Sequence, residues 1–249
     1  MSASMNVIIP DWPVPKNIRA LSTFRTGGVS SVPFKSFNLA HHVGDSSQSV
    51  RDNRSILRRE WLLPAEPVWL NQTHSTTAIE LSDKSYDTNA DASWTEEFDT
   101  VCVVMTADCL PLLIYSPERN KVAAVHAGWR GLADGIIEET ISAMQVGCED
   151  LQVWLGPAIG PQAFEVGEDV RELFVLQDAS ADACFIKTAK TAKYMANIYE
   201  LARRRLKKIG VKNISGGDFC TFSDPERFFS YRREGTTGRM ATLIWISEP

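Results

Sequence analysis

Short apolar runs and amphipathic stretches alternate irregularly along the chain. Six runs are apolar or β-branched and bounded by turn residues, as expected for strands. They are AIELS (78–82), TVCVVMT (100–106), PLLIY (111–115), KVAAVHA (121–127), LQVWLG (151–156) and ATLIWIS (241–247). Apolar residues at helical spacing predict helices over 50–61, 132–144, 170–174 and 195–209. Gly210 follows the last of these, where a helix C-cap favours glycine.

The order of these elements predicts one mixed α/β unit. No linker-like stretch or internal repeat interrupts residues 1–249, so we expect a single domain. The predicted strands 111–115 and 121–127 are separated only by SPERN, which is too short for a parallel crossover and fits a hairpin. The pattern therefore favours antiparallel pairing over a Rossmann-type sheet.

Composition and charge narrow the class of protein. The chain has 26 basic and 31 acidic residues and a net charge of −5, which offers no field suited to nucleic acid or an anionic membrane. The first residues, MSASMNVIIP, lack the basic and apolar regions of a signal peptide. Five cysteines without paired spacing fit reduced thiols. We therefore expect a cytoplasmic protein whose partners are small molecules.

The hairpin brings one cysteine and one histidine to the same end of two strands. If the chain turns at 117–120, Cys109 lies near His126 at the open end of the ladder. The two side chains share a face only if the numbers of paired residues sum to an odd value, and we predict that register, with 109 opposite 126. A thiolate beside an imidazole is half of a zinc site or a nucleophile with its base.

A third ligand would decide between these chemistries. The remaining histidines are His41, His42 and His74, and spacing alone does not choose among them. One of them with Cys109 and His126 would give a zinc site with an open fourth position, which is typical of catalytic zinc.

Eight motifs resemble, in order and over essentially the whole chain, the sequence blocks of the YfiH-like laccase-domain family. They are RTGGVS, FNLAHHVGD, NQTHS, TADCLPLL, AAVHAGWRGL, LGPAIGP, FEVGEDV and FFSYRR. The resemblance implies an α/β fold, a four-layer αββα sandwich with mixed sheets related to the catalytic domain of cytotoxic necrotizing factor. It also implies zinc held by His74, Cys109 and His126.

The resemblance further implies enzymatic activity on purine nucleosides. The reactions are phosphorolysis of adenosine, inosine, guanosine and methylthioadenosine, with phosphate as co-substrate, and deamination of adenosine. Editing of peptidoglycan precursors has also been attached to bacterial members.

Deamination needs a hydroxide at C6 of adenosine, and zinc lowers the pKa of bound water from about 15.7 to about 7. A carboxylate must then carry the proton, and Asp108, next to Cys109, is the candidate for this catalytic role. A backbone hydrogen-bond acceptor is the alternative function of this aspartate.

Phosphorolysis needs cationic donors that hold phosphate near the metal. Arg130 is the first candidate, because it follows His126 by four residues at the start of a predicted helix. Arg25, and Arg232 or Arg233, are further candidates, with a structural salt bridge as the alternative for each.

Two residues of the FNLAHH block, Asn38 and His41, are candidates for contact with ribose or base.

Three other functions are open to the same residues, and the first of them, oxidation by copper, is limited by the number of histidines. A multicopper laccase needs on the order of ten histidines, and this chain has four, so copper is expected only as a weak single-site oxidant in vitro. A metal-free hydrolase would use Cys109 as nucleophile and His126 as base. A zinc-stabilised binding module would lose thermal stability on chelation without any turnover to lose.

Overall fold

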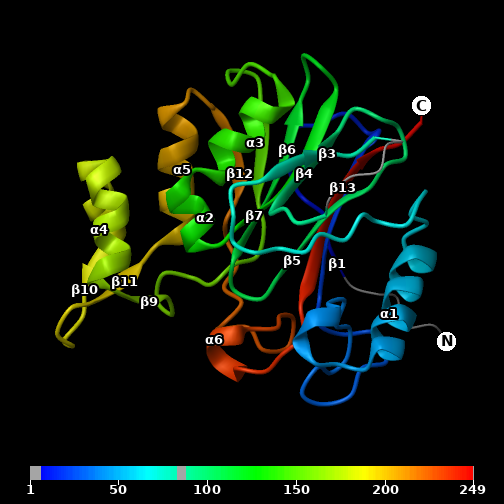
Figure 1. Ribbon diagram of the computed structural model, residues 1–249, viewed down its shortest axis with the longest axis horizontal. Coiled ribbons are helices and arrows are strands. Elements are labelled where there is room, and N and C mark those ends of the chain that lie inside the picture. The colour runs from blue at the N-terminus through cyan, green and yellow to red at the C-terminus, as the bar shows by residue number, and fades with distance from the viewer. Residues whose placement is uncertain (1–6, 83–87, 249) are drawn as a thin grey trace.

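The computed structural model describes residues 7–82 and 88–248, in which two large sheets stack face to face (Figure 1). The first sheet has the order β1 (Val7–Ile8), β2 (Ile18–Thr23), β13 (Met240–Ile246) and β5 (Cys102–Thr106), and all of its strands are antiparallel. The second is mixed. Its order is β12 (Asn213–Gly216), β8 (Gln152–Leu155), β6 (Leu110–Ser116), β7 (Lys121–Ala127), β4 (Ala92–Thr95) and β3 (Ala78–Glu80).

Strand alternation produces the two-sided burial of the second sheet. Along β6, Leu113 and Tyr115 pack toward the first sheet, against residues such as Val104 and Ile244. The intervening Leu112 and Ile114 face the opposite side. Because both faces are covered, every residue of β6 and β7 is buried, which explains why their sequences read as continuous apolar runs.

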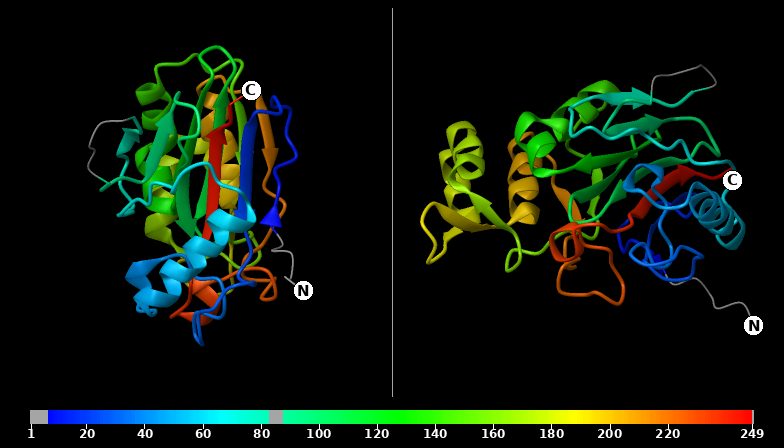
Figure 2. Two further views of the ribbon diagram at one scale, coloured as in Figure 1. Left: turned by 90° about the vertical axis from the view of Figure 1, so that its right-hand side faces the viewer. Right: turned by 60° about the horizontal axis from the view of Figure 1, so that its bottom comes forward.

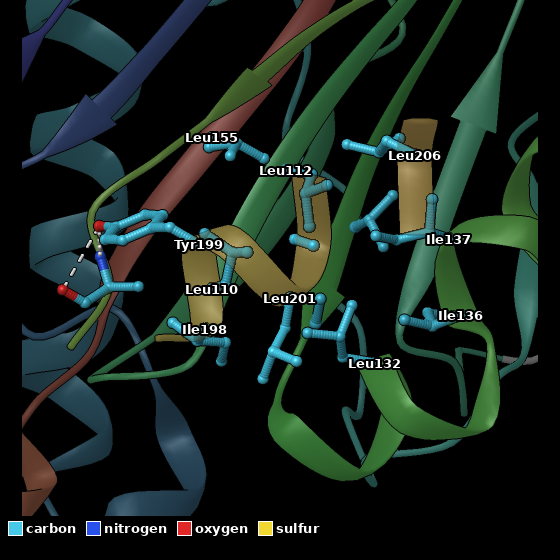
Figure 3. Close-up of a cluster of buried hydrophobic side chains, with 14 of the residues drawn as sticks. Leu110, Leu112, Leu132, Ile136, Ile137, Leu155, Ile198, Tyr199, Leu201 and Leu206 are labelled. Carbon is cyan, nitrogen blue, oxygen red and sulfur yellow. Dashed lines mark hydrogen bonds between the residues drawn. The ribbon is translucent and has the colours of Figure 1, made fainter. Parts of the chain in front are cut away.

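Helices cover the outer face of each sheet. Helix α1 (Ser47–Glu60) packs Leu57 against Leu243 on the first sheet. Helices α2 (Trp129–Asp134), α3 (Ile136–Met144) and α5 (Ile198–Lys208) cover the second sheet, where Figure 3 shows their leucines and isoleucines meeting Leu110 and Leu112. The layers are therefore α, β, β and α, as the family resemblance implies.

A small third unit extends from one end of the sandwich (Figures 1 and 2). It comprises β9 (Glu165–Gly167), α4 (Glu168–Gln177), β10 (Phe185–Lys187), β11 (Lys193–Ala196) and the 3-10 helix η2 (Ala179–Cys184). Its apolar side chains, among them Val170 and Phe174, belong to the same buried cluster as the residues of α5. Two short elements complete the chain, η1 (His41–Val43) and α6 (Tyr231–Glu234).

The sequence-based elements agree with the structure, with two corrections. The predicted helix over 132–144 is two helices, because Gly135 adopts a φ of +103° between α2 and α3. The predicted helix over 195–209 begins at Ile198, since Met195 belongs to strand β11, where it pairs with Glu165. Gly210 follows α5 with a φ of +97°, as the C-cap prediction requires. In the described part of the chain no helix has the length and hydropathy to cross a membrane.

Candidate active site

The β6–β7 hairpin fixes the distance between Cys109 and His126. Its pairs sum to an odd number, as predicted, with Leu110 opposite Ala127 and Pro111 opposite His126. The predicted pairing of 109 with 126 is wrong by two residues, because His126 pairs with Pro111, and Cys109 lies just before β6 begins. The parity keeps Cys109 and His126 on the same face, at the open end of the gap between the sheets.

His74 completes a group of three possible metal ligands. It comes from the loop between α1 and β3, and its Nε2 lies 3.7 Å from Cys109 Sγ. The ring centroids of His74 and His126 are 4.9 Å apart. One ligand atom from each of the three residues lies within 4.8 Å of the others, and among the described residues this is the one such cluster found. His41 and His42 lie outside it.

A carboxylate lies directly behind these ligands. Asp91 is fully buried, immediately before β4, and its Oδ1 accepts a 2.7 Å hydrogen bond from His126 Nδ1. It also accepts hydrogen bonds from the backbone amides of Thr73, His74 and Ser75. Because Nδ1 of His126 is used in this way, Nε2 is left to face Cys109.

The charges of Cys109, His126 and Asp91 stabilise one another. Burial would raise the pKa of the Cys109 thiol, but His126 and hydrogen bonds from both histidines outweigh it and lower the pKa to about 6. Burial would lower the pKa of His126, yet Cys109 and Asp91 raise it to about 9. Asp91 keeps its charge, because its hydrogen bonds hold its pKa well below the usual range despite burial. Cys109 is therefore a thiolate at neutral pH, the form that binds metals or attacks carbonyl groups.

The ligand group opens into a cavity of about 610 Å³ between the sandwich and the small third unit. One part of its wall is apolar and aromatic, formed by Trp129, Ile159, Phe164, Val166, Val170 and Ile198. The other part carries His42, Asp108, Arg232 and Arg239. A flat, apolar ligand with an anionic end would match both parts.

Two of the predicted site residues line this cavity with the ligands. Asp108 is buried, and its carboxylate accepts hydrogen bonds from Thr221 Oγ1 (2.6 Å), Ser230 Oγ (3.0 Å) and the Arg232 amide (2.7 Å). Arg232 lines the cavity on α6, where its Nη1 donates to the carbonyl oxygens of Ala163 and Glu165.

The other predicted residues do not line the cavity. Arg130 is exposed and stacks on Trp129 at 4.3 Å. Arg25 lies at a separate surface pocket, where it forms a 2.6 Å ion pair with Glu234. Asn38 is fully buried and uses its amide on Ala40, Asp45 and the backbone of Arg239. His41 is exposed, and its neighbour His42 reaches the cavity instead. Their substrate-binding roles stay predictions.

Sequence reasoning missed three residues of the site. Gln72 pairs both ends of its side-chain amide with the backbone of Met105 and so ties the His74 loop to β5. Asp91 gave no signal, because strand β4, which follows it, is not among the strands predicted from the sequence. Arg239 gave none, because it lies 130 residues beyond Cys109 and only the folded β13 brings it to the cavity.

Comparison with known proteins identifies the family. Residues 19–247 match a family described as multi-copper polyphenol oxidoreductase laccase. A Haemophilus influenzae protein named purine nucleoside phosphorylase is 51% identical over 243 residues, covering 97% of this chain and 100% of that protein. The chain belongs to the YfiH-like laccase-domain family. Purine nucleoside phosphorylase YfiH of Escherichia coli K12 is also 51% identical, over 96% of this chain and 98% of that protein.

A solved structure confirms the YfiH-like fold. The crystal structure of Neisseria meningitidis protein NMB0706 superposes with a TM-score of 0.92 at 44% identity, covering 98% of this chain and 100% of that chain. The family assignment and the mixed α/β architecture drawn from the eight motifs are thus both confirmed.

Proposed function

We propose that this YfiH-like chain is a zinc-dependent purine nucleoside phosphorylase that also deaminates adenosine. The observation that carries the proposal is the His74–Cys109–His126 group on the wall of a cavity with both an aromatic and a cationic side. The names of the relatives support a nucleoside and phosphate as substrates. We expect the enzyme to act in the cytoplasm on these small molecules.

The three ligand residues fit zinc. For Zn–S of about 2.3 Å and Zn–N of about 2.1 Å, a tetrahedral angle places sulfur and nitrogen about 3.6 Å apart. Cys109 Sγ and His74 Nε2 are 3.7 Å apart. One thiolate and two imidazoles would leave a fourth position open, as in catalytic zinc sites, and zinc would displace the proton that His126 carries at neutral pH. Zinc bound there supplies a Lewis acid and positive charge beside the reacting groups.

Phosphorolysis joins a phosphate oxygen to C1′ of the ribose while the C1′–N9 bond breaks. Inosine and phosphate give hypoxanthine and ribose 1-phosphate, and the departing base takes up a proton. We assign phosphate binding to Arg239, which is partly buried in the cavity wall. Burial lowers the pKa of its guanidinium, against the opposing charges of Cys109 and Asp108, and a bound phosphate would compensate for this loss of solvation. Arg239 Nη1 donates hydrogen bonds to the carbonyl oxygens of Thr237 and Gly238. Arg232 lies on the same wall as a second cation.

The aromatic side of the cavity suits the purine. Trp129 and Phe164 line it with Ile198, and such surfaces bind flat heterocycles by stacking and burial. Adenosine, inosine, guanosine and methylthioadenosine all present the same bicyclic face, so this wall alone does not discriminate among them.

For deamination, Asp108 stays the proposed proton carrier. Three donors hold both of its oxygens, so its carboxylate also fixes the first turn of α6 at the cavity rim. Loss of the Asp108 carboxylate would therefore lower the rates of both deamination and phosphorolysis.

Purified protein is expected to release hypoxanthine from inosine only when phosphate is present, at about one zinc per chain. Reversed-phase chromatography measures the free base, and metal analysis of the same sample gives the zinc content. Arsenate in place of phosphate is expected to sustain base release, whereas base release in the absence of both anions would point to hydrolysis and contradict the phosphorylase proposal.

A second function is favoured by the thiolate of Cys109. With a pKa of about 6 beside a protonated His126, Cys109 has the charge state of a nucleophile in a Cys–His hydrolase. Such an enzyme would cleave an amide or ester, for example in peptidoglycan precursors, and would not need His74. Copper at the same ligands would give at most the weak phenol oxidation of a single-copper site.

Close packing around the ligands gives a steric prediction. A Cβ at Gly128 would lie 2.7 Å from His74 Cδ2 and 3.1 Å from Cys109 Sγ, while the φ of −60° suits any residue. Gly128→Ala is expected to displace the His74 ring and weaken zinc binding about tenfold, without unfolding the chain. This is the size expected when a residue that only orients a metal ligand is changed. Competition with a chromophoric chelator measures the change.

Gly147→Ala is the matched control, because its Cβ would meet only Glu118 Oε2 at 3.4 Å. Equal zinc affinities in the two variants would show that the His74 ring does not occupy the ligand position described above.

A further inference from the structure

One buried carboxylate contacts both histidines of the ligand group by different routes. Asp91 Oδ1 accepts from the ring of His126 at 2.7 Å and from the backbone amide of His74 at 3.0 Å. Asp91 Oδ2 accepts from the Thr73 amide at 3.1 Å, the Ser75 amide at 2.6 Å and the Ser75 hydroxyl at 2.7 Å. We infer that Asp91 is a positioning residue that sets the ring orientation of His126 and the backbone of the His74 loop for metal binding.

The backbone fixes Asp91 itself opposite His126. The main-chain oxygen of Asp91 accepts from the His126 amide at 2.7 Å, next to the ladder in which Ala92 pairs with Val125. The Asp91 amide donates to Thr77. Strand pairing thus fixes the backbone of Asp91 relative to that of His126, so that the Asp91 carboxylate reaches the His126 ring.

The His74 loop depends on the same carboxylate. His74 has a φ of +63°, a left-handed conformation that is uncommon for a residue with a side chain. Three successive amides around it point at Asp91, so the carboxylate compensates for the unfavourable backbone. An exposed imidazole on this loop is thereby held where Cys109 and His126 can share a metal with it.

A carboxylate is the side chain that this position requires. All five partners of Asp91 are donors, and an ionised carboxylate only accepts. Asparagine would place an NH₂ group against at least two of these donors. If that NH₂ replaced Oδ1, His126 could accept from it only with its proton on Nε2, the nitrogen that faces Cys109. A histidine in that tautomer does not bind zinc through Nε2.

This inference rests on the metal-binding part of the proposed function, and zinc affinity tests it apart from catalysis. Asp91→Asn is expected to bind zinc about 10- to 100-fold more weakly than the unchanged chain, the usual range for second-sphere changes. A competing chromophoric chelator gives the affinity, and far-ultraviolet circular dichroism at the same concentration reports whether the variant is folded.

Asp45→Asn is the matched control, because Asp45 also accepts several hydrogen bonds, from Ser30, Asn38 and Ser46, but contacts no ligand residue. Its zinc affinity is expected to stay within twofold. Folded Asp91→Asn with unchanged zinc affinity would overturn the inference and leave the zinc enzyme standing. Normal zinc binding by the unchanged chain without phosphorolysis would overturn the proposed function and leave the inference standing.

A measurement on the unchanged chain covers the case in which Asp91→Asn does not fold. Nitrogen-15 NMR of the zinc-loaded protein is expected to show His126 with a slowly exchanging proton on Nδ1 and zinc on Nε2, assigned by its loss in His126→Gln. Zinc on Nδ1, or a chain that binds no zinc, would overturn the inference.

Discussion

Replacing His74 with alanine is expected to remove bound zinc and to lower kcat/KM for phosphorolysis at least about a thousandfold. A metal ion bound there would supply several kcal/mol of stabilisation to developing charge, and each ~1.4 kcal/mol is a factor of ten in rate. His74 is exposed, so its removal leaves no cavity in the core and the fold should persist. Metal analysis and steady-state kinetics on the same preparation measure both effects.

The same variant separates the zinc enzyme from the Cys–His hydrolase. His42 lines the same cavity but lies outside the ligand group, so His42→Ala is the control and should retain its zinc. In a metal-free hydrolase, His74→Ala would keep full activity and alkylation of Cys109 in the presence of a chelator would abolish it. That result would contradict the zinc proposal.

Replacing Arg239 with methionine is expected to raise the KM for phosphate and lower kcat/KM by about tenfold to a hundredfold. A hydrogen bond to a charged group contributes about 1.5–3 kcal/mol, which converts to a loss of that size. Methionine keeps much of the apolar stem and removes the charge. Phosphate-dependent kinetics with inosine measure the loss, and the zinc content is expected to be unchanged, because Arg239 is not a ligand.

Arg130→Met provides the comparison for Arg239→Met. Both residues are arginines near the ligand group, but Arg130 is exposed on Trp129 and Arg239 lines the cavity. We expect the smaller change in phosphate KM at Arg130. A larger change there would assign phosphate to the start of α2, as the sequence alone suggested, and would remove Arg239 from the site.

Local sequence determined the parts of this protein that depend on short-range physics. Two apolar runs joined by the short turn SPERN predicted the β6–β7 hairpin, and its odd-sum register is the one that places Cys109 and His126 on the same face. The motifs NQTHS, TADCLPLL and AAVHAGWRGL then selected His74 over His41 and His42 through the family resemblance, which spacing could not do. The structure brings those same three residues together.

Tertiary structure decided what depends on contacts between distant segments. Arg239 reaches the cavity because β13 lies beside β5 in the first sheet, and Asp91 reaches both histidines because β4 pairs with β7. No local pattern marks either residue, since a lone Asp or Arg carries no periodicity.

The sequence by itself thus determined the hairpin, the family and the three residues that the structure groups as possible metal ligands, because these follow from apolar runs, a short turn and motifs of a few residues. Only the tertiary structure decided which carboxylate holds the histidines and which cation faces the cavity. Those assignments depend on how far apart atoms lie after strands from different parts of the chain have paired, and the pairing is a property of the whole sheet.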